Sequence, residues 1–142
     1  YERTLRSYID ALGLSHVVNL VGSASPDVLA AYYEAADVFP CVSEHEGFCV
    51  PIMEAWYHRV PVVAQAGTAV DETVGHAGVV LRSGNPTRIA AAVARVLDDR
   101  ALAEVLRRRG TARLEEFAVE RSKARLIESV TSAVEAMVGG GV

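Results

Sequence analysis

Apolar residues occur along this chain in short uninterrupted runs that alternate with amphipathic stretches. The runs are rich in β-branched residues and are bounded by Gly, Pro or polar positions, a pattern typical of buried strands. Strands are therefore predicted at residues 17–21, 38–42, 61–65 and 78–81. Apolar positions at helical spacing predict helices at residues 2–12, 26–36, 50–58, 70–74, 86–98, 100–109 and 119–138.

The boundaries of several predicted helices coincide with residues of strong local preference. Ser25 followed by Pro26 predicts a helix start in which Ser25 is the N-cap. Asn85-Pro86 and Gly110 predict breaks between the helices that finish the chain. These signals support an alternation of strand and helix rather than one long helical array.

Strands that alternate with helices, and that are apolar throughout, are typical of a parallel sheet covered on both faces. The predicted fold class is therefore α/β, with a doubly wound parallel sheet. Ligands of such sheets bind beyond the carboxyl ends of the strands. The loops expected to carry function are residues 22–26, 43–50, 66–70 and 82–86.

The chain has 142 residues, of which 51% are hydrophobic, so it is long enough for one domain with a full core or for part of one. No apolar run approaches the roughly 18 residues of a membrane span. Because the first residue is Tyr1 rather than Met, we expect a piece of a longer protein. Cys41 and Cys49 are too few for a disulfide framework, which predicts a reducing, cytoplasmic setting.

A formal net charge of −4 argues against a nucleic-acid partner. The charge is unevenly distributed, because residues 1–81 hold 3 basic and 10 acidic side chains whereas residues 82–125 hold 11 basic and 6 acidic ones. The basic part predicts a solvated helix surface, with peripheral contact to an anionic membrane as the alternative.

Residues 43–56, which begin where the predicted strand 38–42 ends, carry the candidate chemistry. This segment turns at Gly47 and enters a helix, whose first-turn N–H groups form a site for phosphate or diphosphate. Glu46 precedes that helix and Glu54 follows eight residues later. Two carboxylates would repel a phosphate that they faced, but as acceptors they suit neighbouring hydroxyls. A ligand that combines an anionic group with several hydroxyls matches a nucleotide-sugar.

The same residues also have structural interpretations. Glu54 would then complement the helix dipole, and Glu46 would be a solvated turn residue. Cys41, His45 and Cys49 are spaced four apart, so a zinc site is an alternative to two buried thiols beside an exposed imidazole. We expect the latter and hence no metal site. The chain has no G-x-S-x-G, G-x-G-x-x-G or Walker motif, which excludes those nucleophile and phosphate loops.

Four ordered blocks of sequence resemble a known family. They are VVNLVGSAS (17–25), LAAYYEAADVFPCVSEHEGF (29–48), the E-x7-E pair Glu46 and Glu54, and PVVAQAGTAVDETVGHAGVVL (61–81). Together they resemble the carboxyl-terminal, donor-binding domain of the retaining GT-B glycosyltransferases, the glycosyl transferases group 1. The resemblance extends from about Leu5 to about Ala136. It implies a Rossmann-like, doubly wound sheet that is incomplete at its amino-terminal end.

The resemblance implies transfer of a glycosyl group from a nucleotide-diphospho-sugar to an acceptor hydroxyl with retention, usually without a metal or other cofactor. It implies that Glu46 contacts hydroxyls of the donor sugar as the catalytic carboxylate, and that Glu54 accepts from the ribose hydroxyls. Residues implied to approach the donor through backbone groups are Gly47, Phe48, Cys49 and Val50 beside the sugar and diphosphate, and Ala24 and Ser25 beside the nucleobase. Cys49 stands where many members have Gly.

The resemblance also implies parts that this chain lacks, among them the acceptor-binding domain, the first strands of the sheet, and an Arg and a Lys that neutralise the diphosphate. We therefore expect residues 1–142 to bind donor weakly and to be inactive alone. An exposed sheet edge would favour dimers. The acceptor stays open between a glycan, a lipid-linked sugar and a small molecule. The alternatives are a sugar-nucleotide epimerase or phosphorylase of the same fold, and a non-catalytic α/β interaction domain.

Overall fold

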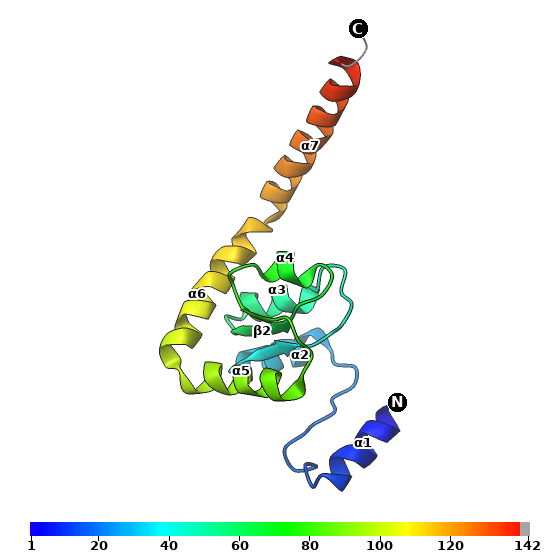
Figure 1. Ribbon diagram of the computed structural model, residues 1–142, viewed down its shortest axis with the longest axis vertical. Coiled ribbons are helices and arrows are strands. Elements are labelled where there is room, and N and C mark those ends of the chain that lie inside the picture. The colour runs from blue at the N-terminus through cyan, green and yellow to red at the C-terminus, as the bar shows by residue number, and fades with distance from the viewer. Residues whose placement is uncertain (140–142) are drawn as a thin grey trace. The chain divides into compact units, whose positions relative to one another are not determined.

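The computed structural model describes residues 1–139, which form two compact units, Tyr1–Tyr32 and the chain from Tyr33 onward (Figure 1). In the first unit, α1 (Glu2–Ala11) agrees with the predicted helix. α2 (Pro26–Ala35), whose residues from Tyr33 onward belong to the second unit, also begins where predicted. The Ser25 carbonyl accepts from the Leu29 amide at 2.9 Å, and the Ser25 hydroxyl lies 3.5 Å from the Val28 amide.

The strand predicted at residues 17–21 is wrong, because this segment is irregular and begins with a turn. The amides of Val17 and Val18 donate to the Leu14 carbonyl at 3.0 and 2.9 Å. Val17 is 65% exposed. A strand needs a hydrogen-bonded neighbour, and the strands that the structure describes pair among themselves. Because this apolar segment has no partner strand within residues 1–139, its first amides form the hydrogen bonds of a local turn instead of a sheet.

Three parallel strands form the sheet of the second unit, in the order β1 (Phe39–Cys41), β2 (Val62–Gln65) and β3 (Val79–Leu81). They correspond to the predicted strands 38–42, 61–65 and 78–81. Cys41, the last residue of β1, lies beside Ala64 of β2. Because all three strands are parallel, the loops that follow them leave the sheet at one edge.

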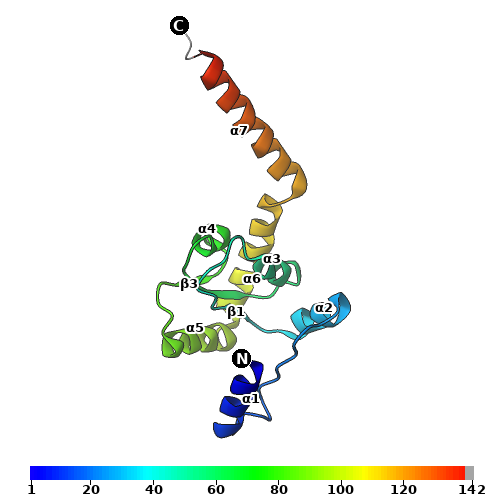
Figure 2. The ribbon, with the colours of Figure 1, turned by 90° about the vertical axis from the view of Figure 1, so that its right-hand side faces the viewer.

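Helices cover both faces of this sheet, which confirms the predicted α/β class. They are α3 (Val50–Tyr57), α4 (Val70–Val74), α5 (Pro86–Asp98) and α6 (Arg100–Glu116), and the exposed helix α7 (Val119–Gly139) follows α6 along the chain. Successive side chains of a strand point to opposite faces. Val62 and Ala64 accordingly pack with α3 and α4, and Val63 packs with α5 and α6. Figures 1 and 2 show α5 on the other side of the strands from α3 and α4.

The predicted break at Gly110 is wrong, because α6 continues through it to Glu116. Gly110 is buried, and a Cβ atom at this position would lie 2.9 Å from Cγ and Nε1 of Trp56 on α3. Glycine is thus required here because α6 and α3 approach each other closely, and it does not end the helix. Trp56 is only 1% exposed, so the contact lies in the core.

α7 agrees with the helix predicted at residues 119–138. Four of its apolar side chains, those of Leu126, Ile127, Val130 and Val134, are each more than half exposed. Among residues 1–139, no helix is both long enough and apolar enough to cross a membrane. The core that positions the site is therefore built by β1 to β3 and by α3 to α6.

Candidate functional site

The loop between β1 and α3 is tied to the loop that follows β2. The Glu46 amide donates to the Thr68 hydroxyl at 3.0 Å, and that hydroxyl donates to the Glu46 carbonyl at 2.6 Å. A Cβ atom on Gly67 would lie 3.0 Å from the Glu44 carbonyl oxygen, so the two loops touch. The carboxyl ends of two neighbouring strands thus build one site, as the parallel sheet predicts.

A second hydroxyl holds the same loop from α4. The Thr73 side chain, which is buried, donates to the Phe48 carbonyl at 3.2 Å. Arg113 on α6 fixes α4 in turn, because its guanidinium donates to the carbonyls of Glu72 and Thr73 at 2.6 and 3.1 Å. The Phe48 ring is 44% exposed. The loop backbone is therefore positioned by side chains from α4 and α6.

The N-cap residue of α3 is Cys49, whose backbone is left-handed with φ 61° and ψ 67°. Non-glycine residues adopt this conformation at a cost of about 1 kcal/mol or more. The position is thus one that favours glycine, in keeping with the glycine that many members of the resembled family carry there. Val50 and Pro51 open the first turn, which contains no acidic residue. The amide groups of this turn remain the predicted site for an anion.

Glu54 lies one turn into α3 and is bound by a tyrosine from α2. The Tyr33 hydroxyl lies 3.0 Å from Oε2 of Glu54 and 3.3 Å from the Pro51 carbonyl oxygen. Burial of the phenol raises the pKa of Tyr33, and the hydrogen bond to Glu54 raises it further, so the hydroxyl keeps its proton and donates. The dipole effect fades beyond the first turn, so it does not account for Glu54.

The Tyr33 ring is fixed by its neighbours. It stacks on His58 with ring centres 5.5 Å apart and an interplanar angle of 9°, and it packs against Phe39 at 5.8 Å. Tyr33 is 7% exposed. A rigid donor of this kind restricts the rotamers of the Glu54 carboxylate.

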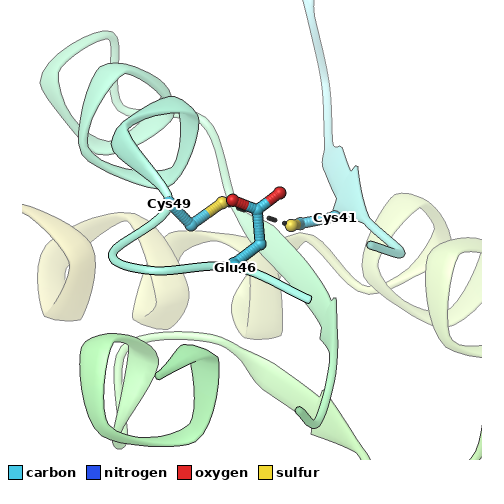
Figure 3. A group of neighbouring side chains, drawn as sticks. All are labelled: Cys41, Glu46 and Cys49. Atoms are coloured by element: carbon cyan, nitrogen blue, oxygen red, sulfur yellow. Dashed lines mark hydrogen bonds between the residues drawn. The ribbon is translucent and has the colours of Figure 1, made fainter. Parts of the chain in front are cut away.

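The Glu46 carboxylate points toward Cys41 and Cys49 (Figure 3). The two Sγ atoms lie 3.4 Å apart, both cysteines are free and buried, and the ligand atoms of the three residues lie within 4.8 Å of one another. Burial, the hydrogen bond with Cys41 and the charge of Glu46 raise the pKa of the Cys49 thiol to about 12. His45, the third member of the zinc alternative, is exposed and lies outside this group.

The structure therefore brings most of the predicted site residues onto one loop and one helix start. These residues are Glu46, Gly47, Phe48, Cys49 and Val50, with Glu54 one turn further along α3. Ala24 and Ser25 belong to the other unit, where they precede α2 and are exposed, so their role stays a prediction.

The sequence pattern does not predict the roles of Tyr33, Thr68, Thr73 and Arg113. Thr68 lies in the predicted functional loop 66–70, which was the one available signal. A tyrosine beside Leu29 on a predicted helix is expected from the sequence to be a packing residue, and this is the sequence-based interpretation of Tyr33. Its ring does pack in the core, but its hydroxyl also binds Glu54. Hydrogen bonds between residues more than 20 positions apart leave no local pattern in a single sequence.

The family model of the glycosyl transferases group 1 matches residues 1–113. The chain belongs to this family. The matched part of this glycosyltransferase chain includes β1 to β3, α3 and the whole loop that carries Glu46.

Relatives of this glycosyltransferase chain are considerably longer. O-antigen chain mannosyltransferase B of Escherichia coli is 32% identical over 112 residues, which cover 79% of this chain and 29% of that protein. Sucrose-phosphate synthase of Thermosynechococcus elongatus has a TM-score of 0.72 and 27% identity, and the match covers 92% of this chain and 34% of that one. Anabaena HepE, solved in complex with UDP, has a TM-score of 0.80 at 24% identity over 93% of this chain and 37% of that one, and shows the shared fold.

Proposed function

We propose that this chain is the donor-binding part of a glycosyltransferase that transfers a sugar from a nucleotide-diphospho-sugar to an acceptor hydroxyl with retention. The observation that carries the proposal is the placement of Glu46 and Glu54 on either side of the start of α3, at the carboxyl end of β1. Family membership supports glycosyl transfer, and the UDP bound by a protein of the same fold supports a nucleotide diphosphate as the ligand class.

In this proposal the start of α3 binds the diphosphate. The amides at Gly47, Phe48, Cys49 and Val50 face the phosphate oxygens, and the positive end of the helix dipole favours their charge. As the bond to the sugar breaks, negative charge grows on the departing diphosphate. Fixed dipoles aimed at that charge stabilise the transition state without reorganising.

The two carboxylates hold hydroxyls rather than phosphates. Glu46 accepts hydrogen bonds from the donor sugar and places the anomeric carbon, and we assign it the catalytic role. Glu54 accepts from the ribose, with Tyr33 fixing one of its oxygens so that the other faces the ligand. Ala24 and Ser25 border the nucleobase through backbone groups. No metal or other cofactor is required for these roles.

The rest of the proposal concerns the surroundings of the site. The acceptor is a glycan, a lipid-linked sugar or a small molecule, and is bound by parts of the protein outside residues 1–142. We propose a cytoplasmic protein in which the basic side chains of residues 82–125 allow peripheral contact with an anionic membrane. Liposome binding that is equal at low and high salt would contradict the membrane contact.

The proposal is tested by titrating the isotope-labelled chain with UDP, GDP and ADP and with their sugars while amide shifts are recorded. We expect one base series to shift residues 46–54 together with Ala24 and Ser25. Glu54→Ala should abolish the shifts, and the exposed control Glu44→Ala should retain them. Shifts confined to other parts of the chain, or absence of shifts in both this chain and the longer enzyme, would contradict the assignment.

The catalytic roles are tested in the longer enzyme. Glu46→Ala should remove most turnover while the nucleotide still binds, because the lost contacts are to the sugar. Glu54→Ala should mainly raise the KM for the donor. Unchanged kinetics in both variants would contradict these roles.

A further inference from the structure

The two cysteines of this chain form a preorganised pair of sulfur ligands inside the donor loop. Cys41 ends β1 and Cys49 is the N-cap residue of α3, and their Sγ atoms lie 3.4 Å apart although eight positions separate them. Ligands about 2.3 Å from a tetrahedral zinc ion are separated by about 3.8 Å when both are thiolates. A shift of a few tenths of an ångström would therefore place both sulfurs correctly around one metal ion.

Glu46 supplies a third ligand atom on the more exposed side of the pair (Figure 3). Its carboxylate oxygen and the two sulfurs all lie within 4.8 Å of one another. Two hydrogen bonds with the Thr68 hydroxyl hold the backbone of Glu46 in place. The point from which the Glu46 side chain extends toward the sulfurs is therefore fixed. Because Glu46 is half-buried whereas both cysteines are buried, a metal ion would enter from the carboxylate side.

We propose that Cys41, Cys49 and Glu46 form a binding site for a thiophilic divalent metal ion of the Zn²⁺ class, with water as the fourth ligand. Two thiolates select such ions over Mg²⁺ or Mn²⁺, which prefer oxygen ligands. Three protein ligands with an open fourth position are a common zinc arrangement.

Occupation of this site would inhibit donor binding, a consequence that rests on the proposed function. A carboxylate that ligates a metal ion through its near oxygen is no longer positioned to accept from sugar hydroxyls. Cys49 is also the N-cap residue of α3, so its movement toward a metal ion would shift the amides proposed for the diphosphate. Metal and nucleotide-sugar therefore compete for the same loop.

The metal site is tested first without nucleotide, by titrating the reduced 142-residue chain with Cd²⁺ and following the ultraviolet thiolate-to-metal absorption. We expect one Cd²⁺ per chain. Cys41→Ser and Cys49→Gly should each lower the affinity by about 100-fold or more, and Glu46→Gln by about 10-fold. Glycine suits the left-handed backbone at residue 49, so that variant should fold. Glu44→Gln, an exposed neighbour outside the group, should leave the affinity unchanged.

The result that would overturn the site is absence of the thiolate absorption in the parent chain, or equal affinity in Glu46→Gln and Glu44→Gln. A Cys41–Cys49 disulfide in protein purified without oxidant would overturn it as well, since a disulfide does not ligate zinc.

Competition is tested with Zn²⁺ and the nucleotide-sugar that shifts residues 46–54. Saturating Zn²⁺ should weaken its binding at least tenfold in the parent chain and leave it unchanged in the thiol-free Cys41→Ser/Cys49→Gly variant. Equal affinity with and without Zn²⁺ in the parent would overturn the competition. If neither this chain nor the longer enzyme bound a nucleotide-sugar, the proposed function would be contradicted, and intact Cd²⁺ binding would still support the metal site.

Discussion

Single hydrogen bonds and buried thiols define the site at the scale of the residue. A hydrogen bond with the Tyr33 hydroxyl orients the Glu54 carboxylate, and a hydrogen bond with the Thr68 hydroxyl positions the Glu46 backbone. Cys49 occupies a left-handed conformation while its thiol lies against Cys41. The Tyr33–Glu54 hydrogen bond and the thiol pair are at least partly shielded from water, where removal of one partner costs more than the bond itself contributes.

Tyr33→Phe should weaken nucleotide binding without removing it. The variant loses one hydrogen bond to a carboxylate, and Glu54 gains rotamer freedom, so affinity should fall by about threefold to tenfold. Calorimetric or amide-shift titration with the bound nucleotide measures this. Tyr32→Phe, at the exposed neighbouring tyrosine, is the matched control and should bind normally. Equal affinity in both variants would show that the Tyr33 hydroxyl does not position Glu54.

Stability should fall as the pH rises above about 9. The Cys49 thiol has a pKa of about 12 in the folded chain, whereas an unfolded thiol ionises near a pKa of about 8.5. Between these values the unfolded chain releases a proton that the folded chain keeps, so unfolding becomes more favourable with pH. We expect a loss of about 1–2 kcal/mol between pH 7.5 and 10 in urea titrations. Cys49→Gly should reduce this dependence, and an identical slope would contradict the thiol's contribution.

At the scale of the element, the sequence pattern predicted α3 and the strands well because their signals are local. Continuous apolar runs mark β1, β2 and β3, and Pro51 marks the first turn of α3. The strand predicted at residues 17–21 has the same composition but no partner strand among the described residues. Pairing is a long-range property, so composition alone does not decide it.

Gly110 illustrates the same limit in a helix. Glycine after Arg109 indicates a helix end on propensity alone, yet α6 passes through it to accommodate Trp56. In the candidate site too, some residues can be predicted from the sequence and others only from the structure. The E-x7-E pair was visible in the sequence, whereas the supporting hydroxyls of Thr68, Thr73 and Tyr33 became visible only once the loops were placed side by side.

Gly110→Ala should destabilise the α3–α6 contact. The added methyl group would overlap the Trp56 indole, which is buried and has little room to move, so we expect a loss of about 1–3 kcal/mol in unfolding free energy. Urea denaturation followed by tryptophan fluorescence measures it, because Trp56 is the chain's one tryptophan. Thr111→Ala, at an exposed adjacent position, should stay within about 0.5 kcal/mol of the parent. A stable Gly110→Ala variant would show that the two helices are not in close contact.

At the scale of the whole molecule, the distribution of charge bears on how tightly a diphosphate binds. Residues 33–81, which belong to the second unit and contain the loop and α3, hold 1 basic and 7 acidic side chains. The basic side chains of residues 82–125 include Arg113, which is occupied by α4 carbonyls and by Glu116. An anion that reaches α3 therefore meets helix amides within a negatively charged surrounding, and the favourable dipole is opposed by repulsion.

This balance predicts an unusual salt dependence for nucleotide binding by residues 1–142. Where cationic side chains bind a diphosphate, affinity falls as salt screens the attraction. Here salt screens mainly the repulsion from the acidic surroundings, so we expect the affinity for the selected nucleoside diphosphate to stay constant or rise between about 20 and about 300 mM NaCl, where the Debye length falls from about 20 Å to about 6 Å. The same chain should show no glycosyl transfer to any acceptor tested. The longer enzyme is the control, because the cations implied by its family should make its nucleotide affinity fall with salt. A steep fall in the isolated chain would contradict this account and indicate that its own arginines reach the diphosphate.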